Sequence, residues 1–386
     1  MTMEKETAVL TQQHIKQLHL KQIFLSALNS GGISRAELRQ QLGLSFPAVT
    51  ALVEELLEAK LLFADGTLSP GERGRPRSLL RVNPTALAIP VAALTAEGYR
   101  CCLYGSDLRL LTQVFLPMQG QDVTAPLALW LEEVKQRHPV TALVLTFPGN
   151  LDRKGALSSS VLGFSTGERF LERLKEQTGL QVFAYNNADC AAYGEKYCQE
   201  LPEDYIFVSV SRGVGAGIIR HGKLFSGGIL RAGEIGHISI DYRGKPCSCG
   251  GRGCLERYIS MEQILQEAFP EGNGTLETLC TGFWEKDPRI TGLLAEKAQL
   301  LALGIRNMLA MQPVSHIVLG GQLCRLGEPF RQLLSHCIPG AGLRKYMDRM
   351  TVCLSRNTAG EIPGALRIYL DHDLSMDAFP AMRCEL

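Results

Sequence analysis

The spacing of hydrophobic residues divides the chain into a helical N-terminal part and a longer part in which strands and helices alternate. Between residues 14 and 28, apolar side chains recur every three to four positions, as on the buried face of a helix, and Asn-Ser-Gly-Gly at 29–32 ends this run. From about residue 86, short apolar runs alternate with helical ones, and glycines cluster between them, which predicts an α/β domain. The predicted strands are 88–95, 101–104, 142–146, 182–185, 206–210, 217–219 and 316–319.

Two further helices are expected after the first. Ser34, with Glu37 three residues later, forms a capping-box pattern, and the short helix that begins there ends near Gly43. Ser45 is expected to cap a third helix, which has Pro47 in its first turn. Three short helices with a tight, glycine-containing turn between the second and third predict a helix-turn-helix.

The segment after these helices predicts a wing. Residues 61–63 and 78–82 have the character of two strands, and the loop between them places three arginines around Gly-Arg-Pro against one glutamate. In such a module the third helix lies in the major groove, and a basic, proline-stiffened loop suits a narrow minor groove. A three-helix bundle that binds protein is the alternative, and the basic loop favours DNA. The expected DNA contacts are Ser45, Phe46, Pro47 and Thr50 on the helix and Arg73, Arg75 and Arg77 on the wing.

Composition narrows the class of protein. The 45% hydrophobic and 20% charged content is that of a globular protein with real cores, and a net charge of +1 means that DNA binding depends on local basic patches. The first 22 residues are polar, and no apolar run reaches the ~18 residues of a membrane span, so we expect a cytoplasmic protein with no membrane partner. The twelve cysteines then indicate reduced thiols and a metal site rather than a disulfide framework.

One histidine and three cysteines gather in a glycine-rich segment at 237–254. The set Cys₃His is typical of closed, tetrahedral zinc sites, and it leaves no position for a catalytic water, so a structural Zn²⁺ is expected. Reduced cysteines in a surface loop are the alternative. The expected ligands are His237, Cys247, Cys249 and Cys254.

These residues resemble the ROK family, which groups sugar-responsive repressors with sugar kinases. The resemblance covers nearly the whole chain, in the order found in the repressor branch. It implies a two-lobed, actin-like (ribonuclease-H-like) sugar-kinase fold that follows the winged helix, with a sugar held between the lobes. The segments that carry it are Gly-Glu-Ile-Gly-His at 233–237, Cys-x-Cys-Gly-x-x-Gly-Cys-Leu-Glu at 247–256, Asn-Asn-Ala-Asp-Cys-Ala-Ala at 186–192, the loop 211–217, Phe-Pro-Gly at 147–149 and Ile-Val-Leu-Gly-Gly at 317–321.

The resemblance also implies a set of ligand contacts. Carboxylates and amides suit a polyol, because each hydroxyl both donates and accepts. His237 would be shared, with one ring nitrogen on zinc and the other available to a sugar hydroxyl. For Asn186 and Glu256, contacts to local backbone are the alternative. The implied sugar contacts are Asn186, Asn187, Glu234, His237 and Glu256, and the implied phosphate-or-ligand loop contributes Arg212, Gly213 and Gly215.

Three departures from the kinase pattern argue against phosphoryl transfer, and no catalytic residue is assigned. Asn187 stands where the kinases have the aspartate that acts as general base. Residues 92–96 lack the acid and glycines of the kinases' Asp-x-Gly-Gly-Thr phosphate loop. Arg212 replaces a threonine of the second phosphate loop, where it can serve as a donor fork for a phosphate or form a structural salt bridge.

We therefore expect a DNA-binding domain at 1–85 and a ligand-sensing domain at 86–386. The predicted function is a transcriptional repressor of carbohydrate-utilisation genes, which binds double-stranded operator DNA as a homodimer or tetramer. A sugar or sugar phosphate in a catalytically inactive kinase cleft would control it. One alternative is an active ATP-dependent sugar kinase that carries a DNA-binding domain, and another is a DNA-bound scaffold that binds no small molecule.

Overall fold

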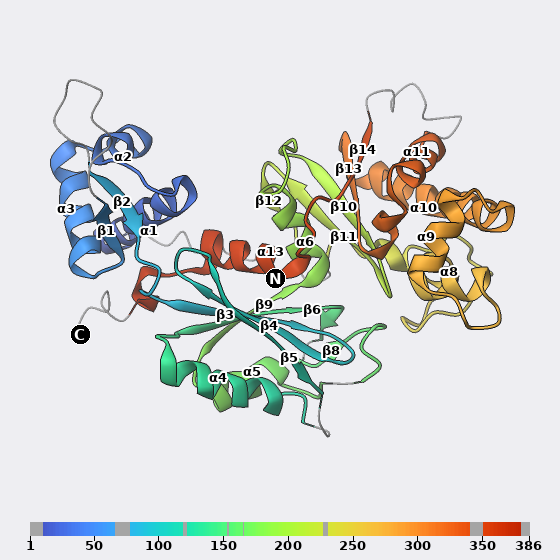
Figure 1. Cartoon of the computed structure of the whole chain (residues 1–386), viewed down its shortest axis with the longest axis horizontal. Helices are drawn as coiled ribbons and strands as arrows, with labels where there is room; N and C mark the ends of the chain where they lie inside the picture. The colour runs from blue at the N-terminus through green and yellow to red at the C-terminus, as the bar shows by residue number, and fades with distance from the viewer. Residues whose placement is uncertain are drawn as a thin grey trace, which may run out of the picture.

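The chain folds into a small N-terminal unit and two larger lobes (Figure 1). Each of the two lobes is built around a five-stranded sheet. We describe it from a computed structural model. The structure describes residues 11–65, 78–118, 122–152, 154–164, 166–226, 231–339 and 350–379.

The N-terminal unit has the helices and strands that the sequence predicts. Its elements are α1 (Gln12–Ser30), α2 (Arg35–Leu42), α3 (Phe46–Glu58), β1 (Leu62–Asp65) and β2 (Leu79–Val82), and β1 pairs antiparallel with β2. The capping box is confirmed, since the Ser34 side chain accepts from the Glu37 N–H while the Glu37 carboxylate accepts from the Ser34 N–H. Ser45 caps α3 by accepting from the Ala48 N–H. Local hydrogen bonds of this kind set where α2 and α3 begin.

The first lobe carries a sheet in the order β5-β4-β3-β6-β9. Strands β3, β4 and β5 pair antiparallel, whereas β6 and β9 run parallel to β3. Helices α4 and α5 cover one face, and α13 lies against the other (Figure 1). The bounds are β3 (Ala88–Leu94), β4 (Gly98–Gly105), β5 (Leu110–Pro117), α4 (Ala125–Arg137), β6 (Ala142–Phe147), β7 (Asn150–Leu151), β8 (Leu157–Ser158), α5 (Phe170–Thr178), β9 (Gln181–Asn186) and α13 (Glu361–Ile368).

The second lobe repeats this plan in the order β12-β11-β10-β13-β14, with antiparallel pairs at one edge and parallel strands at the other. Helix α6 packs on one face of the sheet, and α7–α11 share the hydrophobic core on the other. The two lobes together confirm the predicted actin-like arrangement. The bounds are α6 (Asn187–Glu195), β10 (Tyr205–Val210), β11 (Val214–Arg220), β12 (Lys223–Leu224), η1 (Ile235–His237), α7 (Glu256–Ile259), α8 (Met261–Ala268), α9 (Leu276–Trp284), α10 (Pro288–Met311), β13 (His316–Gly320), η2 (Gln322–Leu326), α11 (Gly327–Cys337) and β14 (Thr351–Leu354).

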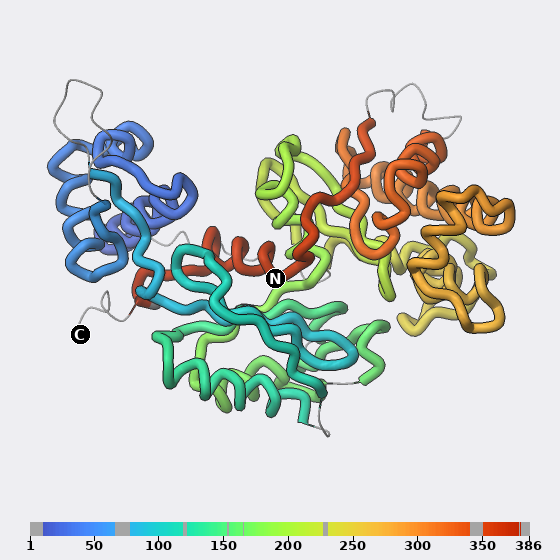
Figure 2. The backbone as a smooth tube through the Cα atoms, in the orientation of Figure 1, coloured from blue at the N-terminus to red at the C-terminus, as the bar shows by residue number. Residues whose placement is uncertain are grey.

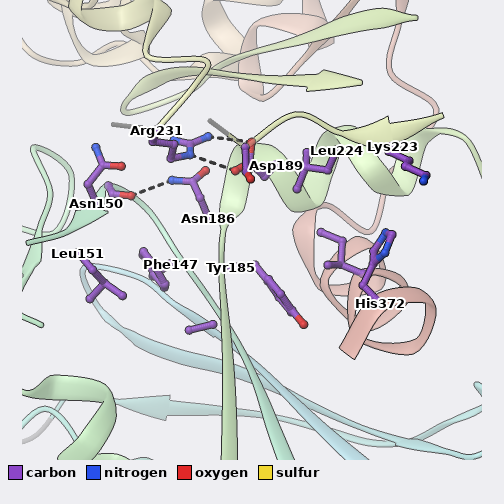
Figure 3. Close-up of a pocket in the computed structure, with 14 residues that line it drawn as sticks. Phe147, Asn150, Leu151, Tyr185, Asn186, Asp189, Lys223, Leu224, Arg231 and His372 are labelled. Carbon is purple, nitrogen blue, oxygen red and sulfur yellow. Dashed lines mark hydrogen bonds and ion pairs between the residues drawn. The ribbon is translucent and has the colours of Figure 1, made fainter. Parts of the chain in front are cut away.

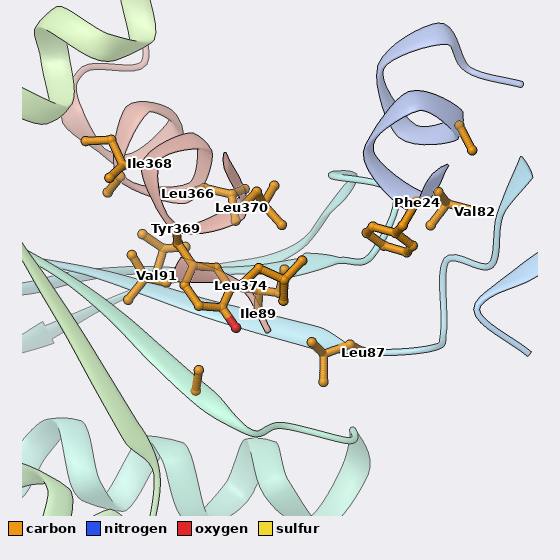
Figure 4. Close-up of a cluster of buried hydrophobic side chains, with 14 of the residues drawn as sticks. Phe24, Val82, Leu87, Ile89, Val91, Leu366, Ile368, Tyr369, Leu370 and Leu374 are labelled. Atoms are coloured by element: carbon orange, nitrogen blue, oxygen red, sulfur yellow. The ribbon is translucent and has the colours of Figure 1, made fainter. Parts of the chain in front are cut away.

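A shared hydrophobic core joins the N-terminal unit to the end of the chain. After α13 the chain continues through η3 (Tyr369–Asp373) and η4 (Met376–Ala378) towards the N-terminal unit, as the red tube in Figure 2 shows. Phe24 of α1 is 1% exposed and its ring centroid lies 5.3 Å from that of Phe379. Figure 4 shows Phe24 in the same cluster as Leu370 and Leu374, and Arg367 donates to the Asn29 side chain at 2.7 Å. The N-terminal unit is therefore packed onto the segment that leaves α13.

Helices α6 and α13 cross between the lobes at close backbone distance. A methyl group at Gly194 of α6 would lie 3.3 Å from the Gly364 Cα, and one at Gly364 would overlap the carbonyl oxygen of Cys190. Since α6 rests on the sheet of one lobe and α13 on the sheet of the other, this crossing sets the spacing of the lobes. No described helix combines the length and the apolar character that a membrane span requires.

Gly364→Ala should destabilise the protein by about 1–3 kcal/mol, because the added methyl group meets a backbone oxygen that cannot rotate away. The measurement is the urea midpoint of unfolding. Gly292→Ala in α10 is the matched control, since its added methyl group meets nothing within 4 Å and removing a helical glycine is mildly stabilising. Equal midpoints for Gly364→Ala and the wild type would show that the crossing is looser than described.

Candidate functional site

A cleft of about 1090 Å³ lies between the lobes and brings together the ligand residues that the sequence predicts. Its first-lobe wall includes residues 148–150, which follow β6, and its second-lobe wall includes the turn before β11 and the start of α7. The predicted residues that line it are Asn186, Asn187, Arg212, Gly213, Gly215, Glu234, His237 and Glu256.

Asn186 and Asn187 lie at the start of α6. The Asn186 side-chain oxygen accepts from the Ala188 N–H at 2.7 Å, and its amide nitrogen donates to the Gly149 carbonyl at 2.9 Å. Asn186 is 6% exposed. Both its amide oxygen and its amide nitrogen are hydrogen-bonded to backbone, which is the role that we expected as the alternative to sugar binding. The Asn187 side-chain oxygen lies 2.8 Å from the same Ala188 N–H.

The two predicted carboxylates are both held by donors. Glu256 is the first residue of α7, and its Oε2 accepts from the Val214 N–H at 2.9 Å. Glu234 Oε1 accepts from Asn150 Nδ2 at 3.2 Å and from Arg231 Nη1 at 2.9 Å. Because Asn150 belongs to the first lobe and Glu234 to the second, this hydrogen bond spans the cleft.

Sequence reasoning missed Asp189, Arg231 and Asn150. Arg231 donates from Nε and Nη2 to the two carboxylate oxygens of Asp189, each at 3.1 Å (Figure 3). Burial raises the pKa of Asp189, and the Arg231 guanidinium offsets part of this effect. Asp189 lies within the segment 186–192 that carries the family resemblance, but nothing in the sequence indicated a partner for it, and an acidic residue there is also typical of a helix start.

Arg231 also borders a second cavity, of about 580 Å³, which Figure 3 shows. This cavity shares Gly149, Asn150, Asn186 and Arg231 with the cleft. It extends past Tyr185 to His372 of η3, in the segment that leads to the N-terminal unit. We call it the rear cavity.

The second phosphate-loop position contacts the first lobe. Arg212 Nη2 lies 2.7 Å from Glu97 Oε1, and both side chains are about half exposed. Glu97 belongs to the turn between β3 and β4. This turn directly follows residues 92–96, the segment that lacks the glycines of the kinases' first phosphate loop. The hydrogen bond from Arg212 lowers the pKa of Glu97. Arg212 thus forms the salt bridge that was its expected alternative to a phosphate contact.

The four predicted metal ligands converge. Their ligand atoms all lie within 4.8 Å of one another, with Cys247 Sγ 3.6 Å from His237 Nδ1 and Cys249 Sγ 3.6 Å from Cys254 Sγ. The Gly251 N–H lowers the pKa of the Cys249 thiol, while burial raises the pKa of the Cys254 thiol to about 12. This donor set can hold a metal ion, which would displace the thiol protons.

The predicted DNA-contacting residues of α3 lie at its exposed start. Ser45, Phe46 and Pro47 are exposed, and Phe46 retains 52% of its accessible surface. Thr50 is partly exposed and its hydroxyl donates to the Phe46 carbonyl at 2.9 Å. The wing residues Arg73, Arg75 and Arg77 lie outside the described residues.

Comparison with known proteins agrees with this architecture. A model described as the ROK family matches residues 100–365. The chain is 27% identical to the xylose repressor of Bacillus subtilis strain 168 over 266 residues, which are 66% of this chain and 69% of that protein. It is 24% identical to the DNA-binding transcriptional repressor Mlc of Escherichia coli K12 over 365 residues, 88% of this chain and 89% of that protein.

Solved structures share the fold. A ROK family transcriptional regulator described as a homolog of the E. coli Mlc protein superimposes with a TM-score of 0.77 at 24% identity, covering 91% of this chain and 95% of that chain. A ROK hexokinase from Thermus thermophilus superimposes with a TM-score of 0.59 at 24% identity, covering 72% of this chain and 96% of that chain. The regulator therefore matches a larger share of this chain than the kinase does.

Cys254→Ser should lower the metal content of the purified chain, because it removes a buried ligand of the Cys₃His set. Metal content should also fall as the pH is lowered, since protons compete with the ion for the thiolates and the imidazole. Elemental analysis of dialysed protein measures both effects. Cys198→Ser is the control, as Cys198 is an exposed thiol outside the set. A folded wild-type chain without metal at neutral pH would contradict the assignment.

Proposed function

This chain belongs to the ROK family, and we propose that it is a DNA-binding transcriptional repressor of carbohydrate-utilisation genes with a sugar-responsive cleft. The observation that carries the proposal is the shared core of the N-terminal unit and the segment that leaves α13. A ligand that changes the lobes can act on the DNA-binding unit through this core. The names of the xylose repressor and of Mlc, which are repressors, support the same assignment.

Residues 1–85 form the proposed DNA-binding domain and residues 86–386 the proposed sensor. The start of α3 would face base edges in the major groove, because Ser45, Phe46 and Pro47 are exposed there. The arginines of the wing would contact the minor groove or the phosphates. A winged helix that reads a two-fold operator requires at least a dimer, so we propose a homodimer or tetramer.

The cleft is proposed to bind a sugar without transferring phosphate. Glu234 and Glu256 offer carboxylate oxygens to hydroxyl groups, as a polyol requires. An amide, Asn187, occupies the position of the kinase general base and has no useful basicity. Arg212, at the second phosphate-loop position, pairs through Nη2 with the carboxylate of Glu97, which would compete there with the phosphates of a nucleotide. The effector can be a neutral sugar or a sugar phosphate, and the experiment below includes both.

We propose that the metal is a structural Zn²⁺. Tetrahedral zinc has Zn–S bonds of about 2.3 Å and Zn–N bonds of about 2.0–2.1 Å, so its ligand atoms lie roughly 3.6–3.8 Å apart, close to the 3.6 Å separations found here. His237 would bind the ion through Nδ1, which faces Cys247, and its Nε2 lies 4.0 Å from Glu234 Oε2. Loss of the metal would therefore disturb the cleft as well as the loop.

The function is tested by selecting duplexes from a random DNA library with the full-length protein and then adding sugars. D-Xylose, D-glucose, N-acetyl-D-glucosamine and the 6-phosphates of the latter two form the panel. At least one should raise the melting temperature and change operator affinity, because a ligand that prefers one conformation stabilises it. If the protein selects no duplex, the proposed repressor function is refuted. A protein that binds operator but responds to no sugar would support the scaffold alternative.

Arg75→Ala tests the predicted contact between the wing and DNA in the same binding experiment. It should weaken binding to all sequences and reduce the slope of log K against log salt by about 1, because one phosphate-neutralising cation is lost. Arg109→Ala, an exposed arginine of the first lobe, should leave both quantities unchanged.

Asn187→Asp should remain inactive as a sugar kinase. A general base raises the rate of the chemical step by about 10²–10⁴-fold, but only when the ATP phosphates are already in line with the sugar hydroxyl. The β3–β4 turn and Arg212 do not offer the phosphate contacts of the kinases. Release of ADP from ATP with each sugar of the panel is the measurement. Wild-type turnover above background that disappears in Glu234→Ala would favour the kinase alternative.

A further inference from the structure

Arg231 lies between the cleft and the rear cavity and contacts residues of both. It lines both spaces, and its side chain is only 14% exposed. Nε and Nη2 donate to Asp189, Nη2 also donates to the Ala216 carbonyl at 3.2 Å, and Nη1 donates to Glu234 at 2.9 Å. An arginine has five N–H donors, so these contacts leave one N–H of Nη1 without a partner among the described residues.

Asp189 fixes the plane of this guanidinium. Its side chain is 7% exposed and sits in the first turn of α6, where the helix dipole favours a carboxylate. A bidentate pair restrains an arginine more tightly than a single contact does, because both the position and the rotation of the planar group are set. Nη1, the guanidinium nitrogen that does not contact Asp189, is therefore held at a defined place beside the cleft.

Glu234 accepts a hydrogen bond from Nη1 of Arg231. Its Oε1 accepts from Arg231 and from Asn150, and these two donors fix the rotation of the carboxylate. No described residue forms a hydrogen bond with Oε2, and His237 Nε2 lies 4.0 Å from it, so Oε2 remains available to a ligand hydroxyl. An acceptor that is already oriented loses less conformational freedom when a ligand binds.

We infer that Arg231 is a positioning residue for ligand binding, held by Asp189, which orients Glu234 to accept polyol hydroxyls and offers its remaining N–H to a ligand oxygen. The inference rests on the proposed sugar function and adds a determinant of affinity to it. The competing interpretation is an ion pair that only ties the loop before η1 to α6, in which case sugar affinity would not depend on it.

Removal of Arg231 alone would leave Asp189 buried without its partner and could unfold the chain. The decisive variant is therefore Asp189→Asn with Arg231→Met, in which neither charge remains. Arg331→Met is the matched control, because Arg331 also donates from Nε and Nη2 to one carboxylate, that of Glu328, and from Nη1 to a carbonyl, that of Val352, away from the cleft. Binding to the selected operator without sugar checks that each variant is folded.

The measurement is the Kd of the full-length protein, by calorimetry, for D-xylose, D-glucose, N-acetyl-D-glucosamine and the 6-phosphates of the latter two. The double variant should bind the responding sugar roughly 10- to 100-fold more weakly, as expected for loss of charge-assisted hydrogen bonds, while Arg331→Met binds it as the wild type does. Arg231→Lys should recover part of the affinity, because an ammonium can still donate to Glu234.

A folded double variant with wild-type sugar affinity would overturn the inference and leave the proposed function intact. An equal loss of affinity in Arg331→Met would also overturn it, since the loss would then not be specific to Arg231. Failure of the wild type itself to bind any compound of the panel, phosphorylated or not, would refute both the sugar response and this inference, and it would be seen before any variant is made.

Discussion

The crossing of α6 and α13 is the contact on which the rest of the structure depends. Each helix rests on the sheet of a different lobe, and backbone meets backbone at Gly364 and Cys190, so the lobes cannot approach or separate at this point without a change at the crossing. Helix α6 begins at Asn187 in the cleft, and near its other end Tyr193 donates to Asp371, 2.6 Å away in η3. One rigid element therefore links the cleft to the segment that packs on the N-terminal unit.

Ion pairs occupy two arginines that line the cleft. Arg231 pairs with Asp189 and Glu234 at a mostly buried position, whereas Arg212 pairs with Glu97 at a half-exposed one. The cleft lining also includes carboxylate and amide groups, which suit hydroxyls. His237 belongs both to the proposed metal site and to the cleft wall, which makes the metal loop part of the ligand site.

Features with local causes could be predicted from the sequence. The caps of α2 and α3 depend on side chains three residues from their partners, and the buried strands β3, β6, β10 and β13 consist mainly of apolar residues. The four metal ligands fall within one short segment, so their types and spacing were sufficient to group them. Strand β5 was missed because it is an edge strand whose positions are mostly exposed, and no hydrophobic alternation marks it.

The sequence by itself thus determined the family resemblance and the α/β class, and it grouped four residues that could hold a metal ion. Only the tertiary structure decided that Arg231 pairs with Asp189, that Arg212 pairs with Glu97, and that Phe24 packs on Phe379. Each of these pairs joins residues far apart in the chain, and their partners are fixed by how two sheets and two crossing helices stack. Local hydrogen bonds and periodicity carry no information about such pairings, because many alternative partners satisfy the same local pattern.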